Sequence, residues 1–353
     1  MLISRAELIR GALAGGTLAG AALPGLAPNA LAYAAEPGAF RPDTAAGGPQ
    51  PWIGTPPGGA APLRFVVIGD NTGIAKPGVF DAAMRQISWL QPDFVLSVGD
   101  LIEGYSEDRA EIARQWSAIE ASVAKCGCPF LFTVGNHDVD NAETLDAWRA
   151  RRGAGRYSFT YKGALFIVLN SEDTPTPMAP KVAAGFYERV RLMQSDPDAA
   201  EKETFERIAA SASHAVDEKN PYAALETVNL GDAQLGFVQR TLAKNPNPRW
   251  TFVSIHKPAW KMDSASFNEI EAMLAPRPHT VFAGHTHYFD HAVINGHDYI
   301  NMASTGGVRH RNGPGTMDHV LVVTLTPHGP LYANTRLTGL MDVAGETGQV
   351  RAY

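Results

Sequence analysis

The chain has 353 residues, of which 45% are hydrophobic and 19% are charged, a composition typical of one large globular domain or of a domain with an insertion. Its formal net charge is -6 at pH 7, and no run of Lys or Arg interrupts this acidity. The sequence therefore predicts neither a nucleic-acid-binding patch nor affinity for an anionic membrane surface. Small or acidic partners remain open.

Residues 1–35 have the layout of a secretory signal peptide. Arg5 and Arg10 precede an apolar stretch of small residues, and a small-residue cleavage site follows. The segment around Arg5 also resembles a twin-arginine export motif, except that Ala6 stands in the place of the second arginine. Gly and Pro within the apolar stretch argue against a stable membrane span. We therefore expect the export machinery, by the Tat or the Sec route, to deliver the chain to the periplasm or outside the cell.

The two cysteines, Cys126 and Cys128, are separated by one glycine. Two cysteines cannot supply a disulfide framework for a chain of this size. A bridge between them would close a very small, strained ring. We therefore expect a reduced pair beside a strand, with redox pairing as the alternative.

The order of apolar and helical stretches predicts one folded domain over residues 63–338, in which short apolar runs alternate with helices as in a parallel sheet. Before it, residues 36–62 hold seven prolines among repeated Gly and Ala, which predicts an extended linker without a packed core. Lys162-Gly163 between two apolar runs is a hairpin signal, so we also expect antiparallel strands. Residues 172–229 interrupt the alternation and predict a helical insertion. Residues 339–353 form a C-terminal tail.

Metal-binding side chains follow five of the apolar runs, at the points where the predicted strands end. Three successive runs end in Gly69-Asp70, Gly99-Asp100 and Gly135-Asn136-His137-Asp138. A fourth run ends in His256, and a fifth in Gly284-His285-Thr286-His287. Because the carboxyl ends of the strands in an open α/β sheet line one crevice, we expect these groups to converge. A glycine before a ligand lets the backbone turn sharply and approach an ion closely.

In this order, the motifs resemble those of the calcineurin-like metallophosphoesterases, over roughly residues 63–337. The resemblance implies an α/β fold: a β-sandwich of mixed sheets flanked by helices, with a helical insertion. It also implies an enzyme that hydrolyses a small-molecule phosphate mono- or diester with a hydroxide bridging two metal ions. A zinc peptidase is excluded by pattern, since the sequence has no His-Glu-x-x-His.

The resemblance also assigns roles to single residues. His137, next to a ligand, would protonate the leaving oxygen or stabilise its charge. Mixed oxygen and nitrogen donors suit Mn, Fe, Zn or Co, and the sequence does not choose among them. The implied ligands are two carboxylates, one amide and three histidines: Asp100 bridges both ions, Asp70 and His287 bind the first, and Asn136, His256 and His285 bind the second.

The first motif departs from the family pattern. Many members carry Asp-x-His there, whereas this chain has Asp70-Asn71-Thr72. Purple acid phosphatases also lack that histidine and take a tyrosine three residues after the second Asp, but here Glu103 occupies that position. Glu103 has two open interpretations: a ligand of the first metal, or a carboxylate that orients His137. We prefer the second, because such a hydrogen bond fixes the tautomer of a histidine.

A non-catalytic metal- or phosphate-binding protein that retains the fold is the alternative to an enzyme, because the first site lacks a ligand. The intact Gly135-Asn136-His137-Asp138 motif argues against it. A pure binding protein has no need of a leaving-group histidine beside its metal ligand.

Two further residues are candidate substrate contacts. Asn71 could reach the phosphate or a metal-bound water from the mouth of the crevice, with a turn-forming Asn as the alternative. Arg309 lies in the run 304–311, which follows a strand, and could clamp a phosphate. Solvated loop charge is the alternative there. The spacing singles out no role for Tyr105.

Overall fold

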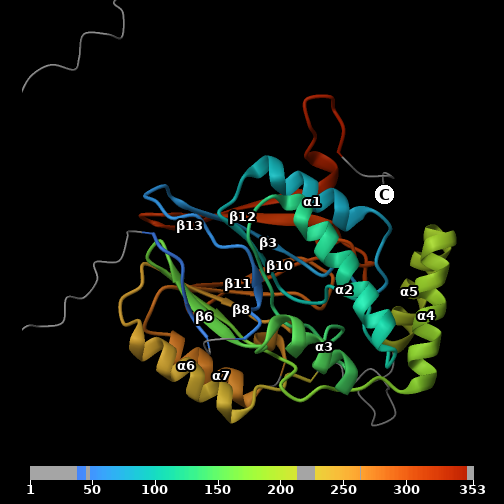
Figure 1. Cartoon of the computed structure of the whole chain (residues 1–353), viewed down its shortest axis with the longest axis horizontal. Helices are drawn as coiled ribbons and strands as arrows, with labels where there is room; N and C mark the ends of the chain where they lie inside the picture. Colours follow the sequence, from blue (N-terminus) through green and yellow to red (C-terminus); the bar gives the residue numbers. More distant parts are fainter. Residues whose placement is uncertain (1–37, 45–47, 213–226, 263, 348–353) are drawn as a thin grey trace, which may run out of the picture. The chain divides into compact units, whose positions relative to one another are not determined.

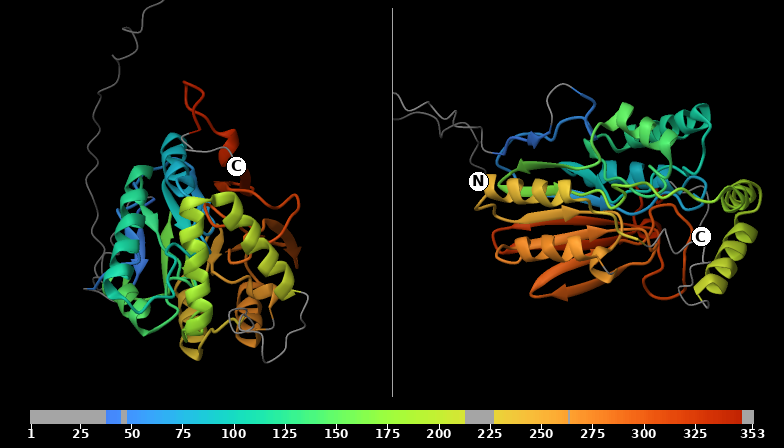
Figure 2. Two further views of the ribbon diagram at one scale, coloured as in Figure 1. Left: turned by 90° about the vertical axis from the view of Figure 1, so that its right-hand side faces the viewer. Right: turned by 90° about the horizontal axis from the view of Figure 1, so that it is seen from below.

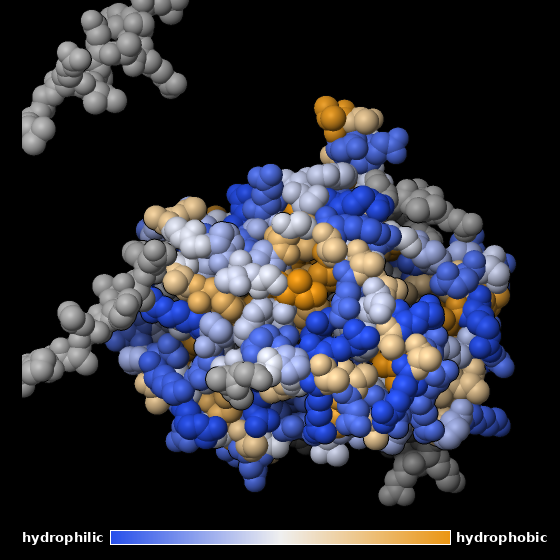
Figure 3. Space-filling view, viewed as in Figure 1, coloured by the Kyte–Doolittle hydropathy of each residue, from blue (hydrophilic) through white to orange (hydrophobic). Residues whose placement is uncertain are grey.

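The compact unit at residues 36–353 contains all the residues that the computed structural model describes, namely 38–44, 48–212, 227–262 and 264–347. The predicted signal peptide lies outside them, as does part of the predicted insertion. In the described part of the chain, no helix is both long enough and apolar enough to cross a membrane. Polar side chains cover most of the face in Figure 3.

Two mixed β-sheets pack face to face in this unit, which confirms the predicted fold class (Figure 1). Parallel pairs lie at the centre of each sheet and antiparallel pairs at its sides. The six-stranded sheet has the order β13 (Gly329–Arg336), β12 (His319–Thr326), β3 (Leu63–Ile68), β4 (Phe94–Ser97), β5 (Phe130–Leu131), β2 (Trp52–Ile53). The seven-stranded sheet has the order β1 (Arg41–Asp43), β6 (Tyr157–Tyr161), β7 (Ala164–Val168), β8 (Thr251–Ser254), β9 (His279–Ala283), β11 (His297–Asn301), β10 (Asp290–Ile294).

Helices cover the outer faces of both sheets, so the strands are buried on two sides (Figure 2). Strand β3 shows why its sequence is apolar throughout. Phe65 and Val67 face the other sheet, while Val66 and Ile68 face the helices, as expected for alternating side chains in a strand. The six-stranded sheet is covered by α1 (Val79–Leu90), α2 (Arg109–Val123) and α3 (Ala142–Arg152), and the seven-stranded sheet by α6 (Asp232–Lys244) and α7 (Ala265–Leu274).

The expectation of a linker without a packed core is wrong for the described residues between 38 and 62. Strand β1 pairs with β6 and strand β2 pairs with β5, so this segment adds one edge strand to each sheet. Phe40 packs on Phe159, with ring centroids 5.0 Å apart, and Trp52 packs against the same core. The prolines did not prevent this pairing, because proline is tolerated in short edge strands.

Two consecutive helices, α4 (Pro180–Ser195) and α5 (Pro197–Ala212), lie within the stretch predicted as an insertion (Figure 1). The two ends of that stretch meet where Glu172 forms a β-bridge with Asn229. Phe186 of α4 packs in a small apolar cluster with residues of the main domain. The insertion is therefore attached to the domain both at its base and along a helix.

The sulfur atoms of Cys126 and Cys128 lie 3.6 Å apart, and both cysteines are free thiols. Cys126 is the last residue of the short 3-10 helix η1 (Ala124–Cys126), which follows α2, and Cys128 lies between η1 and β5.

Candidate metal centre

The six implied ligands lie at the carboxyl ends of five strands, which belong to both sheets. Asp70, Asp100 and Asn136 follow the parallel neighbours β3, β4 and β5. His256 follows β8, and His285 and His287 follow its parallel neighbour β9. Because the strands of each set point the same way, their ends meet at one edge of the sandwich.

One set of donors surrounds Nε2 of His256. This atom lies 3.1 Å from Oδ2 of Asp100 and 3.0 Å from Oδ1 of Asn136. Nδ1 of His256 lies 2.9 Å from the carbonyl oxygen of Val98 and therefore donates to it. That bond leaves Nε2 as the ring nitrogen that faces the two oxygens and that could bind an ion. His285 completes the set, with a ring nitrogen within 4.8 Å of the Asp100 and His256 donors.

The other set is Asp70 and His287. Nε2 of His287 lies 3.3 Å from Oδ2 of Asp70, and Nδ1 donates to the carbonyl oxygen of Val308, so the tautomer is again fixed by the main chain. The backbone N–H of His285 donates to Oδ2 of Asp70 at 2.9 Å. This hydrogen bond joins the two sets of donors.

Burial and charge at these side chains favour a cation. Asp70, Asp100, His256 and His287 are at most 2% exposed. Burial alone would raise the pKa of Asp100, but the charges of His256 and His137 lower it below its usual value. Burial alone would lower the pKa of His256, yet the Asp100 carboxylate raises it to about 9. The carboxylates thus stabilise positive charge at this position, which is the setting that a metal ion requires.

Two glycines allow the close approach of the ligand loops that the motifs predict. A Cβ on Gly135 would lie 2.1 Å from Oδ1 of Asp100, and a Cβ on Gly284 would lie 2.2 Å from Oδ1 of Asp70. Three of the implied ligands have left-handed backbones, with φ of 56° at Asp100, 70° at His285 and 47° at His287. Such conformations are costly for residues with a Cβ and cluster at functional sites.

Asp138 joins two of the ligand loops, a role that sequence reasoning missed. Its carboxylate accepts from the backbone N–H groups of Asp100, Leu101 and Gly135, each at 3.0 Å. A buried carboxylate that accepts several main-chain donors fixes the loops that carry them. The available signal was its position in the Gly135-Asn136-His137-Asp138 motif.

His137 lies against Asp100, but the expected contact with the carboxylate of Glu103 is not formed. The backbone N–H of His137 donates to Oδ1 of Asp100 at 2.9 Å, and Nε2 lies 3.9 Å from Oδ2. Nδ1 donates instead to the carbonyl oxygen of Glu103 at 2.8 Å. His137 is therefore oriented by the main chain.

The carboxylate of Glu103 points to the loop that follows Asp70. It accepts from the hydroxyl of Thr72, from the backbone N–H of Ile74 at 3.0 Å and from that of Ala75 at 2.7 Å. These main-chain donors draw the carboxylate away from His137. Glu103 thus secures the segment that contains Thr72, the position at which the family resemblance implies a histidine.

Neither candidate substrate contact is directed as the sequence suggested. The side-chain amide of Asn71 donates to the carbonyl oxygen of Leu101 at 2.8 Å, and its backbone N–H donates to the carbonyl oxygen of Asp100 at 3.0 Å. Asn71 thus holds the backbone of its loop, in agreement with the alternative of a turn-forming Asn. Nε of Arg309 lies 2.9 Å from a carboxylate oxygen of Glu201 on α5. The sequence could not show that an inserted helix brings an acidic partner to this arginine.

Two aromatic side chains that the sequence did not single out contact the centre. The hydroxyl oxygen of Tyr105 accepts from the amide of Asn136 at 2.7 Å. The ring centroid of His137 lies 4.5 Å from that of Tyr105 and 5.5 Å from that of Phe186. Burial raises the pKa of the Tyr105 hydroxyl well above its usual value, so this hydroxyl stays neutral. Tyr105 reaches the site because Gly104 and Tyr105 have φ of 60° and 48°.

His310 is another residue that sequence reasoning missed. Its ring lies parallel to that of His287, with centroids 3.9 Å apart and an interplanar angle of 15°. The sequence placed it in a loop rich in charge, between two arginines. Only the fold brings that loop onto the end of β9.

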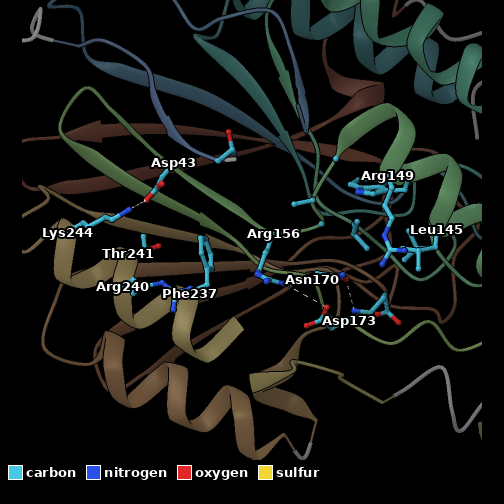
Figure 4. A pocket seen from close by; sticks show the side chains of 18 residues that line it. Asp43, Leu145, Arg149, Arg156, Asn170, Asp173, Phe237, Arg240, Thr241 and Lys244 are labelled. Carbon is cyan, nitrogen blue, oxygen red and sulfur yellow. Dashed lines mark hydrogen bonds and ion pairs between the residues drawn. The ribbon is translucent and has the colours of Figure 1, made fainter. Parts of the chain in front are cut away.

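A cavity of about 530 Å³ opens beside α3 and α6 (Figure 4). Its walls include Arg149, Arg156, Asn170 and Arg240, and none of the six implied metal ligands lines it. Val134 and Val139, on either side of the Asn136 loop, form part of it. The candidate metal centre is therefore not part of this cavity.

Comparisons with known proteins agree with this geometry. A family model described as calcineurin-like phosphoesterase matches residues 63–289. The fold is similar to that of a dimetal phosphatase from Danio rerio, with a TM-score of 0.52 and 12% identity over 78% of this chain and 99% of that chain. No curated protein matches the sequence.

Two other solved structures have similar folds. For purple acid phosphatase PPD1 from yellow lupin (Lupinus luteus) seeds, the TM-score is 0.52 and the identity 14%, over 79% of this chain and 52% of that chain. For PhoD, the TM-score is 0.52 and the identity 11%, over 80% of this chain and 68% of that chain. At such identities the likeness shows the fold alone.

Proposed function

We propose a specific activity for this chain, which belongs to the calcineurin-like phosphoesterase family and is therefore a metal-dependent hydrolase of phosphoric esters. The chain acts, after export, on a small-molecule phosphate mono- or diester. The observation that carries the proposal is the convergence of His256, His285 and Asn136 with the Asp100 carboxylate, beside the pair formed by Asp70 and His287. The named relatives support the fold, and the site itself supports the chemistry.

The donor set fits two transition-metal ions. Asp70 and His287 would hold the first ion, Asn136, His256 and His285 the second, and Asp100 would be shared. Two bound ions would supply a nucleophile at neutral pH and neutralise charge on the phosphate oxygens. Carboxylate, amide and imidazole donors together suit Mn, Fe, Zn or Co.

His137 would act on the leaving group. Its Nδ1–H is committed to the carbonyl oxygen of Glu103, so only Nε2 is available to hold a proton toward the substrate. The rings of Tyr105 and Phe186 lie on His137 and restrict the access of water. This arrangement supports a role for His137 as general acid beside Asp100.

Export is the part of the proposal that depends on the sequence of residues 1–35. The apolar stretch after Arg5 and Arg10 supports delivery to the periplasm or outside the cell. Cell fractionation followed by N-terminal sequencing tests this directly. We expect mature protein outside the cytoplasm that begins near residue 36, whereas full-length chain in the cytoplasm would contradict export.

Turnover of two chromogenic esters tests the catalytic proposal. The purified protein is stripped of metal and assayed with p-nitrophenyl phosphate and bis-p-nitrophenyl phosphate, before and after addition of Mn, Fe, Zn or Co. We expect turnover only with metal, and the better ester identifies mono- or diesterase preference. Folded protein that binds metal yet hydrolyses neither ester, nor any of a wider set of phosphate esters, would support the non-catalytic alternative.

A further inference from the structure

Helix α4 of the insertion packs on His137, the general acid of the proposed reaction. The ring centroid of Phe186 on α4 lies 5.5 Å from that of His137, with an interplanar angle of 53°. It also lies 5.5 Å from the ring centroid of Tyr105, at an angle of 81°. Because Tyr105 itself packs on His137, the three rings contact one another in pairs, at distances usual for aromatic side chains. Phe186 is only 6% exposed, so this contact belongs to the folded interior.

The next residue of α4, Tyr187, holds the main chain beside the same rings. Its hydroxyl donates to the carbonyl oxygen of Gly104. The backbone N–H of Gly104 donates to Oε1 of Gln115 on α2 at 3.1 Å, and the side-chain amide of Gln115 donates to the Tyr187 hydroxyl at 3.1 Å. Both polar groups of the Gly104 backbone are therefore bound, next to the left-handed residue Tyr105. A left-handed residue with a side chain is costly and persists only with such support.

The ring of His137 depends on packing for its orientation. Within the described part of the chain, its one hydrogen bond runs from Nδ1 to the carbonyl oxygen of Glu103. A single hydrogen bond fixes the tautomer but leaves the ring free to swing about that bond, and proton transfer is sensitive to small displacements. The contacts with Tyr105 and Phe186 restrict this motion, since closely packed side chains keep one rotamer.

We infer that Phe186 is a positioning residue, which holds the imidazole of His137 in the orientation that protonates the leaving oxygen. The inference rests on the proposed hydrolysis of a phosphate ester and gives the insertion a part in it, through a residue that belongs to none of the motifs. Phe186 has no polar group and acts through His137. The effect of its removal should therefore depend on the presence of His137.

The leaving group provides the first readout. Wild type, Phe186→Ala and Met193→Ala are compared for metal content and for kcat with phenyl phosphate and p-nitrophenyl phosphate. Met193 is the matched control, because it is buried in the same apolar cluster as Phe186 but lies about 10 Å further along α4. We expect kcat for phenyl phosphate to fall about 10-fold in Phe186→Ala, with a smaller loss for p-nitrophenyl phosphate and unchanged metal content. The more basic leaving group depends more on protonation.

Met193→Ala should keep the wild-type ratio of the two rates. An unchanged ratio in folded Phe186→Ala, or an equal change in Met193→Ala, would overturn the inference.

A double variant separates positioning from a general loosening of the fold. In the His137→Asn background, Phe186→Ala should change neither rate further, because the group that it positions is already absent. The same fold-loss in that background as in the wild type would mean that Phe186 acts independently of His137, and would overturn the inference.

A more conservative variant keeps the test valid if the alanine variant does not fold. Phe186→Leu retains much of the apolar volume and should change the ratio of rates in the same direction by less. In zinc-loaded protein with labelled histidine, the ring-proton NMR signal of His137, identified by its absence from His137→Asn, should also move in Phe186→Leu, because an adjacent aromatic ring is lost. An unmoved signal would contradict the contact. A wild-type chain that hydrolyses no ester would overturn the proposed function, whereas turnover with an unchanged ratio in Phe186→Leu would overturn this inference alone.

Discussion

Nδ1 of His137 donates to the main-chain carbonyl oxygen of Glu103 at 2.8 Å, while the carboxylate of the same residue accepts from the loop of residues 72–75. The orientation of His137 is therefore independent of the side chain at position 103. A carbonyl oxygen accepts only from a protonated nitrogen, so it fixes the tautomer as a carboxylate would.

Replacement of Glu103 by alanine separates the two roles. We expect a loss of about 1–3 kcal/mol in the free energy of unfolding, because the donors of Thr72, Ile74 and Ala75 lose their acceptor. The ratio of kcat for p-nitrophenyl phosphate to kcat for phenyl phosphate should match the wild type, since the carbonyl oxygen that orients His137 remains. Urea unfolding and kcat for the two esters measure both effects. A changed ratio in Glu103→Ala would mean that the carboxylate does act on His137.

Replacement of His137 by asparagine tests the general acid. We expect kcat to fall by about 10²–10⁴-fold, with a larger loss for phenyl phosphate than for p-nitrophenyl phosphate, because the more basic leaving group depends more on protonation. Metal content should match the wild type, as should that of the exposed control His328→Asn. Equal losses for the two esters would contradict a role at the leaving group.

The glycine at position 135 permits the approach of Asp100. An added methyl group would lie 2.1 Å from Oδ1 and 2.4 Å from the backbone nitrogen of Asp100. Gly135→Ala should therefore lose metal and lower Tm, since overpacking forces the ligand out of place. Gly58→Ala is the control, because no atom lies within 4 Å of its Cβ position. Wild-type metal content in Gly135→Ala would show that the loop accommodates a side chain at this position, and would contradict the prediction.

We expect His319 to make the folded protein less stable as the pH falls. Its ring is fully buried, accepts from the backbone N–H of Ala303 at 2.9 Å and lies 2.5 Å from the amide oxygen of Asn334, to which Nδ1 donates. Both nitrogens are committed to the neutral form, and burial, the largest cause, lowers the pKa of His319 from 6.5 to about 4.

The sign of this effect follows from proton binding. Between pH 6.5 and about 4, His319 is protonated in the unfolded chain but neutral in the folded chain. The contribution of neutral, buried His319 to the free energy of unfolding is therefore complete above pH 6.5 and is lost as the pH falls toward 4. We expect a contribution on the order of 3 kcal/mol. Urea unfolding across this range should show a steeper slope for wild type than for His319→Gln. Equal slopes would contradict the assignment.

The sequence predicted the sheet architecture and the six donors because both depend on local pattern. Asp70 and Asp100 follow apolar runs, and parallel strands must end at one edge whatever the rest of the chain does. The prediction of an unpacked linker before residue 63 was wrong because it relied on local composition. The prolines are a local signal, whereas the pairing of Trp52 with Leu131 joins segments far apart in the sequence. Long-range strand pairing overrode composition there.

The outer parts of the site could not be read from the sequence, because side-chain direction depends on distant partners. Glu103 turns toward Ile74 and Ala75, which lie on another loop. Arg309 meets an acid on α5. Tyr105 depends on a left-handed backbone, and His310 on a loop held by Asp70. None of these relations has a fixed spacing that a motif could record.

Asp100→Asn tests the central claim most directly, with metal content and turnover measured on one preparation. Asp100 is the ligand that the two proposed ions would share, and Asp146→Asn is the control, because the Asp146 side chain on α3 is 62% exposed. We predict that Asp100→Asn loses at least one ion and falls below the wild type by about 10²-fold or more in turnover of p-nitrophenyl esters, while Asp146→Asn keeps both. Full metal content and wild-type turnover in Asp100→Asn would contradict the two-metal phosphoesterase.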